Sequence, residues 1–183
     1  GGEGIINAFV SPANVNDLIE RNWKLRYDDI PMELDVVSID IDGMDFYVWA
    51  ALKARPKVVI IEYNSLLPFS VDRVIPPALV SEPGSKNFGA SMQSLLQLGR
   101  SIGYSLVHAE QRGVNLFFVR DDLVRLLPPL LPINNLSALA AGVKFRPCFP
   151  ADSLKDDWIS SSEAIVATET LSKGEDVAGA GAG

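Results

Sequence analysis

The chain has 183 residues, of which 48% are hydrophobic, so it can bury a substantial core and is not a mainly disordered protein. Its 16 basic and 23 acidic residues give a net charge of −7 at pH 7, which would repel the phosphate backbone of a nucleic acid. Cys148 is the only cysteine, which excludes an intrachain disulfide.

The N-terminal part of the chain begins with a strand pattern and a helix pattern. Residues 4–10, "GIINAFV", read as a strand, and Asn14 is a plausible N-cap for a helix near 15–21. A second strand, 34–41, is nearly all apolar in its first half, as expected for a strand that is covered on both faces. These features predict a central strand of a parallel sheet.

The next segments form a strand–helix–strand pattern. The strand over 34–41 is followed by a helix over 45–54, with Asp45 at the N-cap position and Pro56 after its end. Another apolar strand spans 57–63. A single helix that joins two such strands predicts a parallel pair with a right-handed crossover.

Regular patterning stops after this unit and then resumes. Residues 64–90 contain four prolines, and a connection of this length is usually a lid, a binding loop or a disordered segment. Ser91 is a good N-cap for a helix over 92–103, and Gly103 is suited to its C-cap.

The C-terminal part begins with a predicted hairpin and ends in stretches that are rich in only a few residue types. Strands over 104–109 and 114–119 are separated by the turn sequence "EQRG". The sequence becomes proline-rich from Pro128, and from Ala167 it consists mainly of Ser, Thr, Glu, Gly and Ala. That last composition predicts disorder.

Several motifs, in this order along roughly residues 4–122, resemble the second half of an FkbM-type methyltransferase-like domain. They are "DVVSIDIDGMDFYVWAAL", "RPKVVIIEYN", "FGAS", "LGRSIGYSLV" and "GVNLFFVRDDL". The resemblance implies an α/β, Rossmann-like, mainly parallel sheet of order 3-2-1-4-5-7-6, with helices on both faces and a C-terminal antiparallel hairpin. It also implies methyl transfer from S-adenosylmethionine to a small-molecule or sugar hydroxyl.

The chain departs from this family at the cofactor site. The family's glycine-rich loop after the first strand and the acidic residue that ends the second strand have no counterpart here. If residues 4–10 are strand three, then strands one and two are missing, and strand four has an unpaired edge. We therefore expect only the C-terminal half of the domain, with its open edge covered by a protein partner or by another copy.

These patterns divide the chain into three parts. They are a partial methyltransferase-like domain over 1–122, a proline-rich extension over 123–166 and a disordered tail over 167–183. No apolar run is long enough to span a membrane, and residues 1–4 do not read as a signal peptide. We expect an intracellular protein, in the cytoplasm or alternatively in an organelle, that does not bind nucleic acid and does not span a membrane.

Oxygen-bearing side chains lie at the ends of two neighbouring predicted strands. Asp40 and Asp42 end the first strand, and Glu62 and Asn64 end the next. Ligands of open α/β sheets gather beyond the carboxyl ends of strands. The arrangement resembles the metal site of catechol O-methyltransferase-like enzymes and suits Mg²⁺ or Ca²⁺. We therefore predict these four residues as metal ligands and Asp42 as the catalytic candidate.

Each of these acids also has a structural explanation. Asp42 and Gly43 form a common turn pair, Asp45 suffices as a helix cap, and Glu62 could pair with a basic neighbour. Two functions remain open. The parent protein is either a methyltransferase, with or without the help of a metal ion, or a non-catalytic methyltransferase-like remnant that serves as a structural or interaction subunit.

Overall fold

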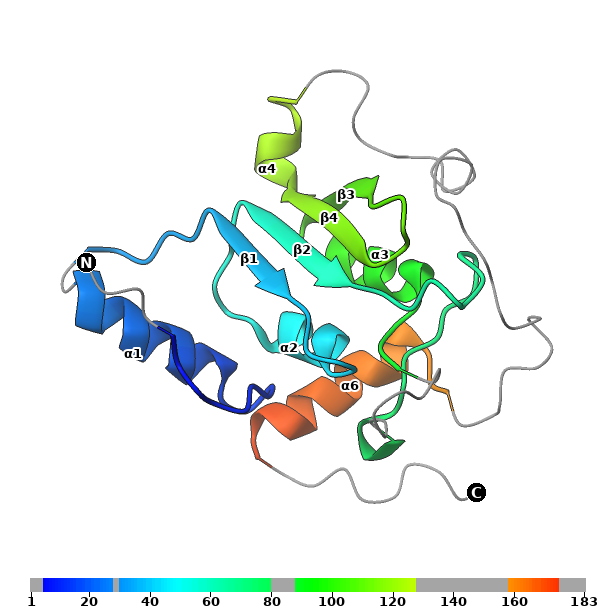
Figure 1. Ribbon diagram of the computed structural model, residues 1–183, viewed down its shortest axis with the longest axis horizontal. Helices are drawn as coiled ribbons and strands as arrows, with labels where there is room; N and C mark the ends of the chain where they lie inside the picture. The colour runs from blue at the N-terminus through cyan, green and yellow to red at the C-terminus, as the bar shows by residue number, and fades with distance from the viewer. Residues whose placement is uncertain (1–4, 28–29, 80–87, 128–157, 175–183) are drawn as a thin grey trace.

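A computed structural model describes residues 5–27, 30–79, 88–127 and 158–174. Within these ranges the chain is an α/β structure in which one sheet is packed against helices (Figure 1). The helices are α1 (Val15–Tyr27), α2 (Asp45–Ala51), α3 (Met92–Ser101), α4 (Asp121–Val124) and α6 (Ser161–Ser172), with a short 3-10 helix η1 (Pro77–Leu79). None of these helices is long and apolar enough to cross a membrane.

The sheet has four strands in the order β1-β2-β4-β3. Strands β1 (Val36–Ile39) and β2 (Val58–Glu62) pair in parallel, whereas β4 (Asn115–Arg120) is antiparallel to both β2 and β3 (Tyr104–Ala109). The sheet is therefore mixed, and β1, β2 and β3 run in the same direction. The strands expected in these four segments and the hairpin between the last two are confirmed, with ends that differ by at most two residues.

One face of the sheet carries the core. Val59 and Ile61 of β2 are fully buried on this face, while Val58, Ile60 and Glu62 alternate with them and are only half-buried. This alternation shows that the two faces of β2 have different surroundings. Helices on both faces were expected, but in the described ranges the second face of β1 and β2 is only partly covered, so this expectation is not met there.

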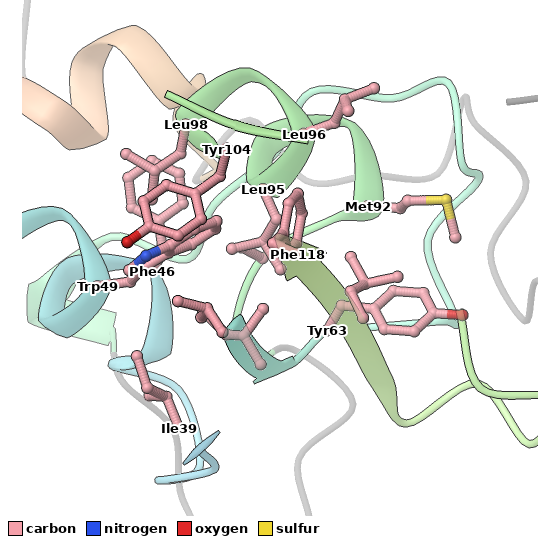
Figure 2. Close-up of a cluster of buried hydrophobic side chains, with 14 of the residues drawn as sticks. Ile39, Phe46, Trp49, Tyr63, Met92, Leu95, Leu96, Leu98, Tyr104 and Phe118 are labelled. Carbon is pink, nitrogen blue, oxygen red and sulfur yellow. The ribbon is translucent and has the colours of Figure 1, made fainter. Parts of the chain in front are cut away.

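Helices α2 and α3 meet above the buried face. A Cβ atom built on Gly99 of α3 would lie 2.9 Å from the ring of Phe118 and 3.1 Å from the ring of Trp49 in α2. The rings of Trp49 and Phe118 are 4.8 Å apart, and that of Tyr104 packs edge-on to Trp49 (Figure 2). Because Gly99 has no side chain, it lets α3 approach both the sheet and α2.

The strand expected over 4–10 is wrong over residues 5–10, which form no strand. A strand needs a neighbour for its backbone donors and acceptors, and none of the described strands pairs with this segment. The side chain of Asn14 accepts the Ser11 N–H and donates to the Phe9 carbonyl, so it holds the segment that precedes α1. Helix α1 itself extends to Tyr27, well beyond the expected end at residue 21.

The disorder expected from residue 167 is wrong through Ser172, because α6 covers these positions. Ser160 and Glu163 form a capping box at its start, and Ala164 and Thr168 are buried where α6 packs on α2 and α3. The helix belongs to the folded body rather than to a tail. Most of the proline-rich extension, 128–157, and the end of the tail, 175–183, lie outside the described residues.

The long connection after β2 is tied to two helices. The carboxylate of Asp72 accepts the Ser94 hydroxyl of α3 at 2.8 Å, and it also accepts both the backbone N–H and the hydroxyl of Ser161 in α6 at 3.0 Å. Val74 adds bridges to Ala90 and Ile159. The described part of this loop is therefore a structural junction.

Candidate functional site

The turn between β1 and α2 is organised by Asp45. This residue was expected to be the N-cap of the helix, but the N-cap is Met44, whose side chain makes no capping bond, and Asp45 is the first helical residue. The Asp45 carboxylate is almost completely buried and accepts the backbone N–H groups of Ile41 and Gly43, both at 3.0 Å. The turn is thus closed by an acid that lies after it in the sequence.

This closed turn presents Asp40 and Asp42 to solvent. Asp42 has a φ of +54°, a left-handed conformation that Asp tolerates better than most residues, and Gly43 follows with a φ of +125°. Both aspartates are exposed. The turn therefore leaves their carboxylates free for ions or ligands.

Glu62 brings a third carboxylate from the neighbouring strand. The parallel register pairs Ile39 with Ile61, so Asp40 and Glu62 follow at adjacent strand ends. One carboxylate oxygen from each of Asp40, Asp42 and Glu62 lies within 4.8 Å of the other two. The structure thus brings together three of the four residues predicted as metal ligands.

The environment of Glu62 disfavours its charged form. Burial, followed by the charges of Asp45, Asp40 and Asp42, raises the pKa of its carboxyl from 4.5 to about 7. Its Oε2 atom is inaccessible to solvent, and among the described residues Glu62 has neither a hydrogen-bond partner for this atom nor an ion pair. The proposed pairing with a basic neighbour is therefore not seen in this part of the chain.

Asn64 has a different set of contacts. Its side chain is fully buried, its Oδ1 accepts the Leu66 N–H at 3.0 Å, and its Nδ2 donates to the Phe88 carbonyl at 3.0 Å. The bond to Phe88 joins the two described ends of the long loop, and the bond to Leu66 closes a local turn at its start. The Asn64 side chain therefore stabilises the loop. The carboxylate cluster consists of the other three predicted residues.

The cluster has the donor set of a hard-cation site. Carboxylate oxygens are the preferred protein ligands of Mg²⁺ and Ca²⁺, and three of them leave further coordination positions for water or a substrate oxygen. A cation would also offset the cost of ionising Glu62 beside two aspartates. The residues present therefore fit a divalent cation.

The described residues do not fit S-adenosylmethionine. No described strand is followed by a glycine-rich turn, and the turn after β1 has already committed the N–H groups of Ile41 and Gly43 to Asp45. These donors cannot also hold the carboxylate of a cofactor. The described residues therefore offer no binding site at which S-adenosylmethionine could react.

Sequence reasoning missed the part played by Asp45 in positioning the site. Its burial could have been anticipated from the fully apolar helix that follows, but its bonds to the preceding turn could not be read from spacing alone. Comparison of the chain with protein families, with curated proteins and with solved structures gives no significant match. The interpretation of the site therefore rests on the geometry of the described residues.

Proposed function

We propose that Asp40, Asp42 and Glu62 bind one divalent cation of the Mg²⁺ or Ca²⁺ type. The observation that carries this proposal is the approach of their carboxylate oxygens to within 4.8 Å at the carboxyl ends of two neighbouring parallel strands. The buried, unpartnered Oε2 of Glu62 supports it independently, because a polar atom without a partner is costly to bury.

The proton on Glu62 couples cation binding to pH. With a pKa of about 7, this carboxyl is partly protonated at neutral pH and must lose its proton before it can bind a cation. Asp40 and Asp42, which are exposed, provide the initial attraction. A bound cation would lower the pKa of a coordinated hydroxyl and fix its position, with Asp42 on the solvent side of the site as the catalytic candidate.

We propose methyl transfer to a small-molecule or sugar hydroxyl as the parent activity of the domain. In support, the order β1-β2-β4-β3 with an antiparallel β4 corresponds to strands 4-5-7-6 of the fold that the sequence motifs resemble. S-adenosylmethionine supplies an electrophilic methyl group when it is bound. Because the described residues do not fit it, the cofactor would be held by a segment that extends the sheet beyond β1.

A second candidate is a non-catalytic interaction subunit. Of the twelve large hydrophobic side chains that are exposed in the described ranges, eight lie between Ile5 and Val36, and Ile5, Phe9 and Leu25 are more than four-fifths exposed. Apolar side chains gathered in one part of a surface often mark an interface. This concentration within residues 5–36 favours a partner that binds this part of the chain.

Calorimetric titrations of S-adenosylmethionine, with and without Mg²⁺, separate these proposals. We expect the purified chain to bind the cation but not the cofactor, because the cation ligands are present and the cofactor turn is not. Saturable binding of S-adenosylmethionine would overturn this account of the cofactor site. A folded chain that binds neither would leave the interaction subunit as the better interpretation.

A further inference from the structure

Asn115 lies next to Glu62 in the sheet. Strand β2 lies between β1 and β4 (Figure 1), and the register pairs Glu62 at the end of β2 with Asn115 at the start of β4. One step further, the Tyr63 N–H donates to the Val114 carbonyl at 3.0 Å. Because bonded and non-bonded pairs alternate in an antiparallel ladder, Glu62 and Asn115 form a non-hydrogen-bonded pair, the type whose side chains lie closer together.

The side chains of this pair share one face of the sheet. Cross-strand partners project from the same face, with Cβ atoms about 4.5–5.5 Å apart. Leu116, which follows Asn115, is fully buried on the face that carries the core, so Asn115 projects from the opposite face, as Glu62 does. Asp40 follows β1 on the other side of Glu62. Asp40, Glu62 and Asn115 thus form a row across three neighbouring strands.

The backbone of Asn115 is fixed, whereas its side chain is uncommitted. The Asn115 carbonyl accepts the Glu110 N–H at 2.9 Å, which holds the residue against the end of β3. The residue is half-buried, and its side-chain amide makes no hydrogen bond with any described residue. Asparagine is depleted in strands, and a structural asparagine near a turn usually bonds to nearby backbone groups. No such bond explains Asn115 within the described part of the chain.

Three carboxylates do not complete the coordination of a cation such as Ca²⁺. This ion takes about six to eight oxygen ligands, and the side-chain oxygen of asparagine is a common one. The Oε2 atom of Glu62 is inaccessible to solvent and has no hydrogen-bond partner among the described residues, which is a separate indication of a ligand beside this pair. An amide oxygen carries no net charge, so a fourth ligand from Asn115 would not add to the repulsion between the three acids.

We propose that the side-chain oxygen of Asn115, Oδ1, is a fourth protein ligand of the cation that Asp40, Asp42 and Glu62 bind. This inference rests on the proposed cation site and extends that site to a third strand. An asparagine side chain changes its rotamer without moving the backbone, so Oδ1 can turn toward the Glu62 carboxylate while β4 keeps its register. The ligands then come from three adjacent strand ends, β1, β2 and β4.

Terbium luminescence tests this assignment, because Tb³⁺ replaces Ca²⁺ at oxygen sites and its lifetimes in H₂O and D₂O give the number of bound waters. Asn115→Val removes the amide and introduces a good strand former, so β4 should still form. We expect this variant to bind Ca²⁺ about fivefold more weakly than the wild type in calorimetric titration, and its bound Tb³⁺ to carry about one more water. Asn115→Asp keeps an oxygen at this position and should retain the wild-type number of waters.

Gln93→Ala is the matched control. Gln93 carries the same amide group and is also half-buried, but it belongs to α3, which packs on the opposite face of the sheet. The control variant should bind Ca²⁺ with the wild-type affinity, and its bound Tb³⁺ should carry the wild-type number of waters. Urea denaturation of each variant shows whether its fold is retained.

If the wild type binds the cation, two results would overturn this inference and leave the proposed cation site in place. One is an unchanged affinity for Ca²⁺ in Asn115→Val. The other is weaker binding with an unchanged number of waters, which would mean that Asn115 acts only by orienting Glu62. A folded wild type that binds neither Ca²⁺ nor Tb³⁺ would instead refute the proposed cation site itself, and with it the role of Asn115.

Discussion

The buried carboxylate of Asp45 accepts the backbone N–H of Gly43 at 3.0 Å, two residues before it in the chain. It also accepts the N–H of Ile41. The acid that begins α2 therefore shapes the turn that displays Asp40 and Asp42. The turn therefore positions two of the three proposed cation ligands.

Replacement of Asp45 should destabilise the fold. Asp45→Ala leaves two backbone donors without their partner and should lower the free energy of unfolding by about 2–4 kcal/mol. Urea denaturation measures this change, with Asp17→Ala in the first turn of α1 as the control. Equal stabilities of the two variants would show that the bonds to Ile41 and Gly43 are not important.

The pKa of Glu62 predicts a specific dependence of stability on pH. Because burial and the neighbouring acids raise its pKa to about 7, the folded chain retains a proton that the unfolded chain releases above its ordinary pKa of 4.5. The free energy of unfolding should therefore fall as pH rises from about 4.5 to 7 and change little from this source above that range. Urea denaturation in EDTA at several pH values measures this slope.

Glu62→Gln isolates the contribution of this one carboxyl. The variant cannot ionise, so it should lack this part of the slope and be more stable than the wild type at about pH 8. Glu169→Gln, an exposed change on α6, should keep the wild-type slope. The same slope in all three proteins would contradict the raised pKa.

The junction at Asp72 should control the attachment of α6. Asp72→Ala removes the acceptor of the Ser161 N–H and hydroxyl and of the Ser94 hydroxyl, so the free energy of unfolding should fall by about 2 kcal/mol. Relative to the wild type, the rate of amide hydrogen exchange should increase more in α6 than in β2. Glu169→Ala is the control on α6, and an α6 that exchanges as slowly as before in Asp72→Ala would argue against this role.

The close approach at Gly99 should not tolerate a methyl group. Gly99→Ala would place its Cβ 2.9 Å from the Phe118 ring, so the cost of overpacking should exceed the gain in helix propensity and give a net loss of about 1–2 kcal/mol. Arg100→Ala, at the neighbouring exposed position of α3, should be close to neutral. Thermal denaturation of both variants tests the prediction, which a stabilised Gly99→Ala would refute.

Much of the sheet and its nearest helices could be predicted from the sequence. The apolar segments that became β1 and β2 and the turn "EQRG" between β3 and β4 carry strong local signals, and Ser91 caps α3 as expected. Residues 5–10 have an equally apolar pattern but form no strand. Periodicity indicates which conformation a segment prefers, whereas a strand also depends on a neighbour that the pattern does not contain.

Helix α6 was missed for a different reason. Its Ser, Ala, Thr and Glu residues are typical of disordered segments, but Ser160 followed by Glu163 is a capping-box signal that could have found its start. At the site, the meeting of Asp40 with Glu62 followed from adjacent parallel strands. The contacts of Asn64 could not be predicted, because its partner Phe88 lies 24 residues away in a connection without a regular pattern.

The central claim is that Asp40, Asp42 and Glu62 form a cation site, and calorimetric titration of MgCl₂ and CaCl₂ into the purified chain tests it most directly. We expect one site with a dissociation constant of about 0.1–1 mM, weakened at least about tenfold by Glu62→Gln and by Asp42→Asn. Binding should strengthen as pH rises through about 7, while Glu169→Gln should bind as the wild type does. No heat of binding from a folded sample, or equal binding by the site variants and the wild type, would contradict the claim.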